Sequence, residues 1–126
     1  MTDKLIFFID DEPMFINLLE YTFSCKSGYS VRTFQSGEEC IENMHLKPDL
    51  VVVDFFLNTG NMTGMDVAKK IKEINPVTIV AFLSGNDDHA VIDEAKSIGV
   101  DKYVLKDGYF IDNLMEYITN LFPSTS

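Results

Sequence analysis

The chain has 126 residues and a net charge of −10, from 20 acidic and 10 basic side chains. The length suits one compact domain, and a hydrophobic content of 46% is too high for a disordered chain. The charge disfavours direct binding to nucleic acid or to a membrane, and it either keeps the domain soluble or gathers carboxylates around a cation. With no apolar run near the ~20 residues of a membrane span and no secretory signal, we expect a soluble cytoplasmic protein.

The first strand is predicted at residues 5–9, an apolar run that stops abruptly at Asp10 and Asp11. Pro13 then suits the first turn of a helix. Residues at helical spacing form the face of this helix that we expect to be buried: Phe15, Leu18, Leu19, Thr22 and Phe23. Gly28 marks the exit from the helix.

Alternating residues at 30–34 predict a second strand. Ser36 is expected to cap the helix that follows, and Glu39, three residues on, would complete a capping box. The inward face of this helix is predicted to hold Cys40, Ile41 and Met44. Residues 50–53 then predict a third buried strand, which also stops at an aspartate, Asp54.

The second half of the chain continues the alternation of helix and strand. The predicted helix, strand, helix, short strand and last helix occupy residues 64–74, 78–83, 88–98, 103–105 and 111–122. The fourth strand stops at Ser84 and the fifth at Lys106. Five strands alternating with five helices predict an α/β fold, doubly wound, with a parallel sheet between two layers of helices. We expect one domain over residues 1–126, with its core at about 4–122 and residues 123–126 as a tail or the start of a linker.

The two cysteines, Cys25 and Cys40, lack the spacing of a metal site, and we expect both to be small buried hydrophobic residues. His45 and His89 have no partner at ligand spacing and are expected to be exposed. The pattern favours neither a disulfide nor a histidine–cysteine metal site.

The residues that follow the predicted strands are expected to share one location. The carboxyl ends of parallel strands meet at one edge of a sheet, and ligands bind there near the point where the strand order reverses. The residues delivered to that edge are Asp10, Asp11, Asp54, Ser84 and Lys106. Three carboxylates repel one another without a cation, and a hard divalent ion such as Mg²⁺ suits them. A cation and an ammonium beside a carboxylate suit a phosphoryl group, with one aspartate as its nucleophile.

Each of these residues also has a plainer interpretation. A single aspartate or serine after a strand usually forms a turn or caps the next helix. A lysine near the surface is usually only solvated. The coincidence of the required side chains at the ends of four different strands favours the shared site.

On these residues the chain resembles a response-regulator receiver domain, the CheY-like domain of two-component signalling, over about residues 4–121. The matching segments are Phe8-Ile9-Asp10-Asp11-Glu12, Val51-Val52-Val53-Asp54, Thr63-Gly64-Met65-Asp66, Phe82-Leu83-Ser84-Gly85 and Tyr103-Val104-Leu105-Lys106. The resemblance implies a flavodoxin-like fold with strand order 2-1-3-4-5.

The resemblance also implies the roles at the acidic end of the site. Asp54 would accept the phosphoryl group in a Mg²⁺-dependent reaction. Mg²⁺ would bind Asp11 directly and Asp10 mainly through water. Asp54 and the backbone carbonyl of Phe56 would be further ligands.

By the same resemblance, Ser84 would hydrogen-bond the phosphoryl group, Lys106 would pair with it, and the rotamer of Tyr103 would follow Ser84. The donor would be a histidine kinase or a histidine phosphotransfer protein. The fourth helix, fifth strand and fifth helix would form the face that switches. This face would act on a downstream protein target or on an appended output domain. The sequence leaves open whether the chain forms a homodimer. Such a domain promotes only its own phosphorylation and dephosphorylation, so we expect no further enzyme activity.

The sequence departs from the usual receiver pattern after Lys106, where Asp107 replaces a proline that commonly forms a cis bond. We expect the Lys106–Asp107 bond to be trans, because a non-proline cis bond costs about 3–4 kcal/mol.

A second departure is the loop after Asp54, which is longer than usual and carries Phe56 where a polar residue is frequent. By resemblance, Phe56 and Asn86 would flank the path of the water that hydrolyses the phosphorylated state, while Gly85 leaves that path open. Phe56 cannot hold a water and Asn86 is a poor base, so we expect slow autodephosphorylation. The plainer interpretation is that Phe56 packs under the long loop.

Three other functions compete with the phosphoacceptor hypothesis. A degenerate receiver would be a phosphorylation-independent interaction module, which the complete set of site residues disfavours. A Mg²⁺-dependent phosphatase with an aspartyl nucleophile needs Asp-x-Asp after its first strand, whereas Asp10 and Asp11 are adjacent. Flavin binding on a similar fold would need a phosphate-cradling loop in place of these acidic residues.

Overall fold

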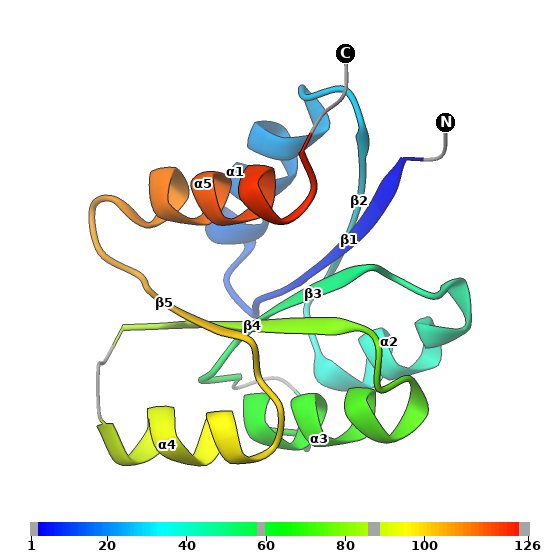
Figure 1. The fold of residues 1–126 in the computed structure, drawn as a ribbon, viewed down its shortest axis with the longest axis vertical. Coiled ribbons are helices and arrows are strands. Elements are labelled where there is room, and N and C mark those ends of the chain that lie inside the picture. Colours follow the sequence, from blue (N-terminus) through cyan, green and yellow to red (C-terminus); the bar gives the residue numbers. More distant parts are fainter. Residues whose placement is uncertain (1–2, 58–59, 86–88, 124–126) are drawn as a thin grey trace.

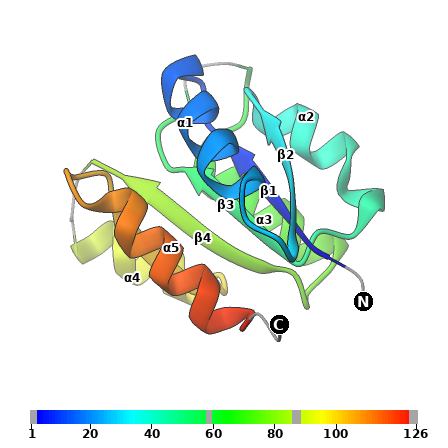
Figure 2. The ribbon, with the colours of Figure 1, turned by 90° about the horizontal axis from the view of Figure 1, so that it is seen from above.

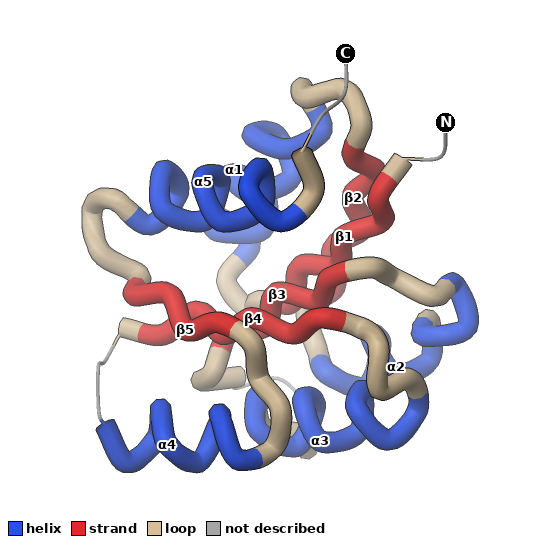
Figure 3. Tube along the Cα trace, viewed as in Figure 1, coloured by secondary structure: helices blue, strands red, loops and turns tan. Residues whose placement is uncertain are grey.

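The computed structural model describes residues 3–57, 60–85 and 89–123, and a single sheet forms its central layer (Figures 1 and 3). The elements in chain order are β1 (Lys4–Ile9), α1 (Pro13–Ser24), β2 (Tyr29–Phe34), α2 (Gly37–Glu42), the 3₁₀ helix η1 (Met44–Leu46), β3 (Leu50–Asp54), α3 (Gly64–Ile74), β4 (Ile79–Ser84), α4 (His89–Ser97), β5 (Lys102–Leu105) and α5 (Phe110–Leu121). All the predicted strands and helices are present, most with ends shifted by a residue or two. The exception is α2, which ends at Glu42, so Met44, predicted on its inward face, is buried in η1 instead, and η1 was not predicted. No helix in these described ranges is long and apolar enough to cross a membrane.

The sheet has five parallel strands in the order β2-β1-β3-β4-β5, which confirms the order implied by the resemblance. The order reverses between β1 and β3, so both flank the point where an open sheet binds its ligands. Register keeps the strand ends level, since Ile9 pairs with Val53 and Asp54 pairs with Leu83.

The sheet separates two hydrophobic cores, as expected for strands buried on both faces. Figures 1 and 2 show α1 and α5 on one face and α2, α3 and α4 on the other. Along β1, Phe7 and Ile9 point into the core under α2 and α3, while Ile6 and Phe8 point into the core under α1 and α5. Both layers therefore fix the position of Asp10, the residue that follows β1.

The buried face of α1 differs from the prediction. Leu18 is 42% exposed, whereas Ile16, which the prediction left out, is buried with Leu19 and Phe23. The buried stripe thus runs through Ile16, Leu19 and Phe23, at i, i+3 and i+7. Phe15 is only half-buried, and it lies close to the functional residues described below.

The prediction for the cysteines is half wrong. Cys40 is buried inside the core under α2, and burial raises the pKa of its thiol to about 12. Cys25 is exposed at the end of α1, because the helix stops at Ser24 and leaves no core beside the next residue. His45 and His89 are exposed, as expected.

Side chains cap the N-termini of α2 and α3. Ser36 caps α2 by accepting from the Glu39 N–H, as predicted, and the Glu39 carboxylate faces the Ser36 hydroxyl at 3.4 Å. The reciprocal capping box is found at α3 instead: the Thr63 hydroxyl accepts from the Asp66 N–H, and the Asp66 carboxylate accepts from the Thr63 N–H, both at 3.1 Å. α3 therefore has a fixed start beyond the long loop.

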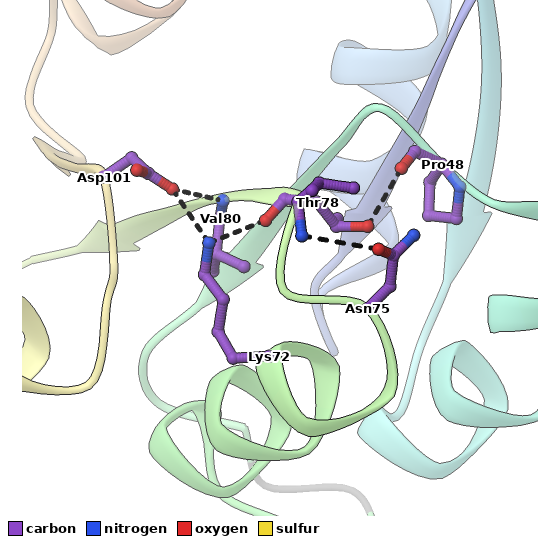
Figure 4. A network of polar contacts seen from close by, with 7 residues as sticks. Pro48, Lys72, Asn75, Thr78, Val80 and Asp101 are labelled. Carbon is purple, nitrogen blue, oxygen red and sulfur yellow. Dashed lines mark hydrogen bonds and ion pairs between the residues drawn. The ribbon is translucent and has the colours of Figure 1, made fainter.

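A network of polar contacts lies at the start of β4, at the edge of the sheet opposite the acidic site residues (Figure 4). Asp101 accepts from the Val80 N–H at 3.0 Å and from the Lys72 ammonium at 3.3 Å. Lys72 also donates to the Thr78 carbonyl at 2.7 Å, and the buried Thr78 hydroxyl donates to the Pro48 carbonyl at 3.2 Å. The network joins α3, the start of β4 and the turn between α4 and β5.

Candidate functional site

The four strand ends deliver their polar residues as predicted. Asp10 extends the β1–β2 ladder by one bond, from its N–H to the Phe34 carbonyl at 3.1 Å. Lys106 extends the β4–β5 ladder in the same way, from its N–H to the Ser84 carbonyl at 2.8 Å. These backbone bonds fix where the side chains begin, so the site is set by the sheet rather than by its loops.

Three carboxylates form the acidic pocket, defined here as Asp10, Asp11 and Asp54. One ligand oxygen from each lies within 4.8 Å of the others, close enough for one ion. Asp10 is completely buried, Asp54 is 6% exposed and Asp11 is half-buried. An all-oxygen donor set of this charge fits a hard divalent cation.

Lys106 supplies the counter-charge to the acidic pocket. Its Nζ lies 2.6 Å from Oδ2 of Asp10 and 3.2 Å from Oδ2 of Asp54. The Lys106 side chain is 11% exposed, so these interactions are poorly screened by solvent. One ammonium against three carboxylates leaves the pocket with net negative charge, which favours a cation.

The electrostatics of the pocket shift two pKa values. Burial and the neighbouring Asp10 charge raise the pKa of Asp54 to about 6, although Lys106 and the Phe56 N–H act in the opposite direction. For Lys106, burial lowers the pKa, but the hydrogen bond to Asp10 and the charges of both carboxylates outweigh it, so the pKa is raised. Lys106 is therefore a permanent cation at neutral pH.

The carboxylate of Asp10 is already engaged at both oxygens. Oδ1 accepts from the Glu12 N–H at 2.9 Å, and Oδ2 accepts from Lys106. Asp11, next to it, reaches the same pocket from a less buried position. The greater exposure of Asp11 is compatible with a direct bond from Asp11 to a cation.

The backbone at residues 54–56 is fixed by hydrogen bonds and by the close approach of α3. The Phe56 N–H donates to Oδ1 of Asp54 at 3.2 Å, and the Phe55 N–H donates to the Leu83 carbonyl at 2.8 Å. A Cβ at Gly64 would lie 2.8 Å from the Asp54 carbonyl oxygen, so only glycine lets α3 approach this closely. The Phe56 ring is 55% exposed and meets Phe55 edge to face at 4.8 Å.

Three further predicted site residues lie on β4, directly after it, or on β5. Ser84 is completely buried at the end of β4, and Tyr103 on β5 is half-buried and pairs in register with Phe82. Gly85 is exposed, and a Cβ there would meet nothing within 4 Å in the described part of the chain. Asn86, predicted to influence hydrolysis, lies outside the described residues.

One neighbour of the site was missed by the sequence reasoning. The ring of Phe15, in the first turn of α1, has its centroid 4.2 Å from Nζ of Lys106. The available signal was an aromatic residue one helical turn beyond Asp11, at the same sheet edge. The described residues contain no cis peptide bond, so the bond after Lys106 is trans, as expected.

Comparison with known families agrees with this geometry. The sequence profile of the response regulator receiver domain matches residues 6–119, most of the chain. The chain belongs to the response regulator receiver family. As a receiver domain, it carries the acidic pocket and Lys106 at the carboxyl ends of its strands.

Two curated relatives and two solved structures place this receiver domain among similar proteins. It is 32% identical over 107 residues to the response regulator protein VraR of Staphylococcus aureus, and 29% identical over 111 residues to VraR of Staphylococcus saprophyticus. Each match covers 84% of this chain and 50% of the relative, so the chain spans about half their length. Chemotaxis protein CheY4 of Vibrio cholerae has a TM-score of 0.84 at 18% identity, covering 96% of this chain and all of that one. The BeF₃-activated DrrB receiver domain has the same TM-score at 22% identity, covering 98% and 100%. The two structures show the same fold.

Proposed function

We propose that this receiver domain is a phosphoacceptor switch that takes a phosphoryl group on Asp54. The observation that carries the proposal is the surroundings of Asp54, which lies with two further carboxylates in one pocket and 3.2 Å from the Lys106 ammonium. Of the three carboxylates, Asp54 alone ends the central strand β3, and Asp10, which also contacts Lys106, already has partners at both of its oxygens.

In the proposed reaction a carboxylate oxygen of Asp54 attacks phosphorus. The new O–P bond forms as the bond from phosphorus to the donor breaks, and the leaving group keeps that electron pair. Lys106 donates to a phosphoryl oxygen as negative charge gathers there, and the Ser84 hydroxyl donates to another. Both side chains start from strands that end beside Asp54, so little reorganisation is needed.

We propose Mg²⁺ as the cation of the acidic pocket. It would be held by Asp11, by Asp10 mainly through water, by Asp54 and by the backbone carbonyl of Phe56. Bound there, Mg²⁺ would supply positive charge to the phosphoryl oxygens. The all-carboxylate donor set and the net negative charge of the pocket support this choice.

The proposed partners follow from the same function. The donor would be a histidine kinase or a histidine phosphotransfer protein, in the cytoplasm. The response would pass through Ser84 and Tyr103 to the face made by α4, β5 and α5, toward a downstream target, an appended output domain or a second copy of the chain. An open groove of about 700 Å³ lies on this face, lined in part by Ile92, Tyr103 and Tyr117, and offers such a partner a surface. We propose that residues 1–126 form one such domain, without further enzyme activity.

The test is incubation of the chain with acetyl phosphate and Mg²⁺, followed by intact and peptide mass spectrometry. Wild type should gain one phosphoryl group, located at Asp54, and Asp54→Asn should gain none. Asp112→Asn, which neutralises an exposed carboxylate in the first turn of α5, is the matched control and should behave as wild type. Phosphorylation of Asp54→Asn at the wild-type level would contradict the assignment. No phosphorylation of wild type would favour the alternative, a degenerate receiver that acts as an interaction module.

A further inference from the structure

In the described part of the chain, two carboxylates and one aromatic ring lie close to the Lys106 ammonium. The carboxylates are those of Asp10 and Asp54, at 2.6 and 3.2 Å. The ring is that of Phe15, whose centroid is 4.2 Å from Nζ. A cation within about 6 Å of a ring centroid is attracted to the electron-rich face of the ring. The ring therefore lies within interaction distance of the ammonium that the proposed phosphotransfer uses.

Phe15 also packs against Phe110, which lies at the end of the loop that follows β5. The ring of Phe110, the first residue of α5, meets Phe15 in an edge-to-face contact at 5.4 Å, and Phe110 is 7% exposed. Lys106 and Phe110 begin and end this loop, while residues 107–109 between them are exposed. Phe15 thus contacts both ends of the loop and is braced by a residue of the core under α1 and α5.

A phenyl ring suits this place because of what it lacks. It carries no strong donor or acceptor, so it leaves the three N–H groups of the ammonium for oxygen partners. A polar side chain or water in the same place would compete for those N–H groups. The lysine side chain has a long flexible stem, and the ring limits the directions in which its charged end can turn.

We propose that Phe15 is a positioning residue for Lys106, and that its ring keeps the ammonium facing Asp10 and Asp54. The proposal rests on the proposed function for its kinetic consequence, because Lys106 must lie beside Asp54 when the phosphoryl group arrives. Without the ring, the ammonium gains other orientations and is correctly placed for a smaller fraction of the time. Phe15 does not touch the transferred group and acts only through Lys106.

The test compares three single variants of residues 1–126, together with Lys106→Ala. Phe15→Leu removes the ring and keeps an apolar side chain, whereas Phe15→Tyr keeps the ring. Phe23→Leu makes the same exchange on the same helix, where Phe23 is fully buried and packs against Phe8 at 5.3 Å, and it controls for lost helix packing.

Two measurements separate position from reactivity. NMR of the protein without Mg²⁺ or phosphodonor reports the ring-current shift of the Lys106 Cε protons, which are assigned by their loss in Lys106→Ala. The rate of phosphorylation by acetyl phosphate at saturating Mg²⁺ reports the kinetic effect. A second pair, Phe15→Leu in the Lys106→Ala background, shows whether the effect passes through Lys106.

Phe15→Leu should move the Cε protons to the shift of an exposed lysine and slow phosphorylation by about 2- to 30-fold, the range expected for one cation–π contact. Phe15→Tyr should keep both properties, Phe23→Leu should lose stability but keep both, and Phe15→Leu should have no further effect without Lys106. An unchanged shift or rate in Phe15→Leu, or an equal loss of rate in Phe23→Leu, would overturn the proposal. If wild type takes no phosphoryl group, the proposed function fails, and the ring-current shift of wild type then decides only whether the Phe15 ring lies against Lys106.

Discussion

The Lys106 ammonium lies closer to Asp10 than to Asp54, at 2.6 against 3.2 Å. In this state the lysine mainly neutralises the buried carboxylate that is not the proposed phosphoacceptor. Asp10 also accepts from the Glu12 N–H, so its two oxygens have partners before any cation arrives. The three aspartates of the acidic pocket are therefore not equivalent toward a metal ion.

The first prediction concerns Mg²⁺ affinity. Asp11→Ala should weaken Mg²⁺ binding more than Asp10→Ala, because the Asp10 oxygens are already committed to Lys106 and Glu12. Both should weaken it, since each removes one negative charge from the pocket. Isothermal titration or NMR titration with Mg²⁺ measures the two constants. A larger effect at Asp10 would reverse the assignment of direct and water-mediated ligands.

The second prediction concerns the pH dependence of stability without Mg²⁺. The pKa of Asp54 is raised from 3.8 to about 6 in the folded protein, by burial and by the Asp10 charge. Because the folded pKa is above the unfolded one, this carboxyl contributes stability below the unfolded pKa and loses that contribution as pH rises through about 6. Above that pH the charged Asp54 therefore destabilises the metal-free fold.

Asp54→Asn should thus be more stable than wild type at pH 8, by about 1 kcal/mol after allowance for solvent screening. The difference should shrink toward zero as the pH falls below 3.8, where Asp54 is protonated in both states. Urea unfolding of both proteins at several pH values gives the comparison, and carboxylates far from Asp54 cancel in it. Added Mg²⁺ should stabilise wild type more than the variant. A difference independent of pH would mean that Asp54 is not the group responsible.

The third prediction concerns the lifetime of the phosphorylated state. Phe56 follows Asp54 by two residues, and its exposed ring has no group to orient a water. Phe56→Asn should hydrolyse the phosphorylated state several-fold faster than wild type, because an amide can hold the attacking water in line. Phosphate release at matched Mg²⁺ measures the rate. If Phe56 only packs beneath the loop, the variant loses stability and its hydrolysis rate stays the same.

The fourth prediction concerns the loop after β3. Gly60 has φ = +76°, and a Cβ there would overlap the carboxylate of Glu38, which accepts from the Asn61 N–H at 2.8 Å. Gly60→Ala should lower the free energy of unfolding by about 1–2 kcal/mol, from backbone strain and from displacement of Glu38. Thermal or urea unfolding measures the loss.

Gly28→Ala is the matched control for Gly60→Ala. Gly28 has φ = +95°, and a Cβ there would have nothing within 4 Å. The control therefore has the backbone strain of a positive φ but no steric overlap with another side chain. The loss at Gly60 should exceed the loss at Gly28, and the excess should disappear in a Glu38→Ala background. Equal losses in the two variants would show that Glu38 does not hold the loop.

The parts of the site that could be predicted are those fixed by the sheet. Asp10, Asp54, Ser84 and Lys106 each follow a strong apolar run, and parallel strands bring their carboxyl ends to one edge. A prediction of the strands was therefore enough to predict the cluster. The strand order itself came from family resemblance, because spacing does not specify it.

The failures have a different physical origin. Apolar residues occupy nearly every side of the first turns of α1, so periodicity could not choose between Leu18 and Ile16 for the buried face. The contact between Phe15 and Lys106 joins residues far apart in the chain, and no local sequence pattern predicts it. Cys25 lies one residue beyond the end of α1. A small error in the predicted end of the helix is therefore enough to predict a buried residue where the structure has an exposed one.

The network around Asp101 gives α4 one fixed end. The turn after α4 is bound to the start of β4 and to α3 through Val80 and Lys72, and the Val100 N–H donates back to the Ala95 carbonyl at 3.0 Å. The other end of α4 follows Ser84 in the chain, on the side of the acidic pocket. In the proposed switch, a displacement that starts at Ser84 would tilt α4 about its fixed end beside Asp101. A nine-residue helix is roughly 13 Å long, so each 5° of tilt moves the free end by roughly 1 Å and leaves the fixed end where it is.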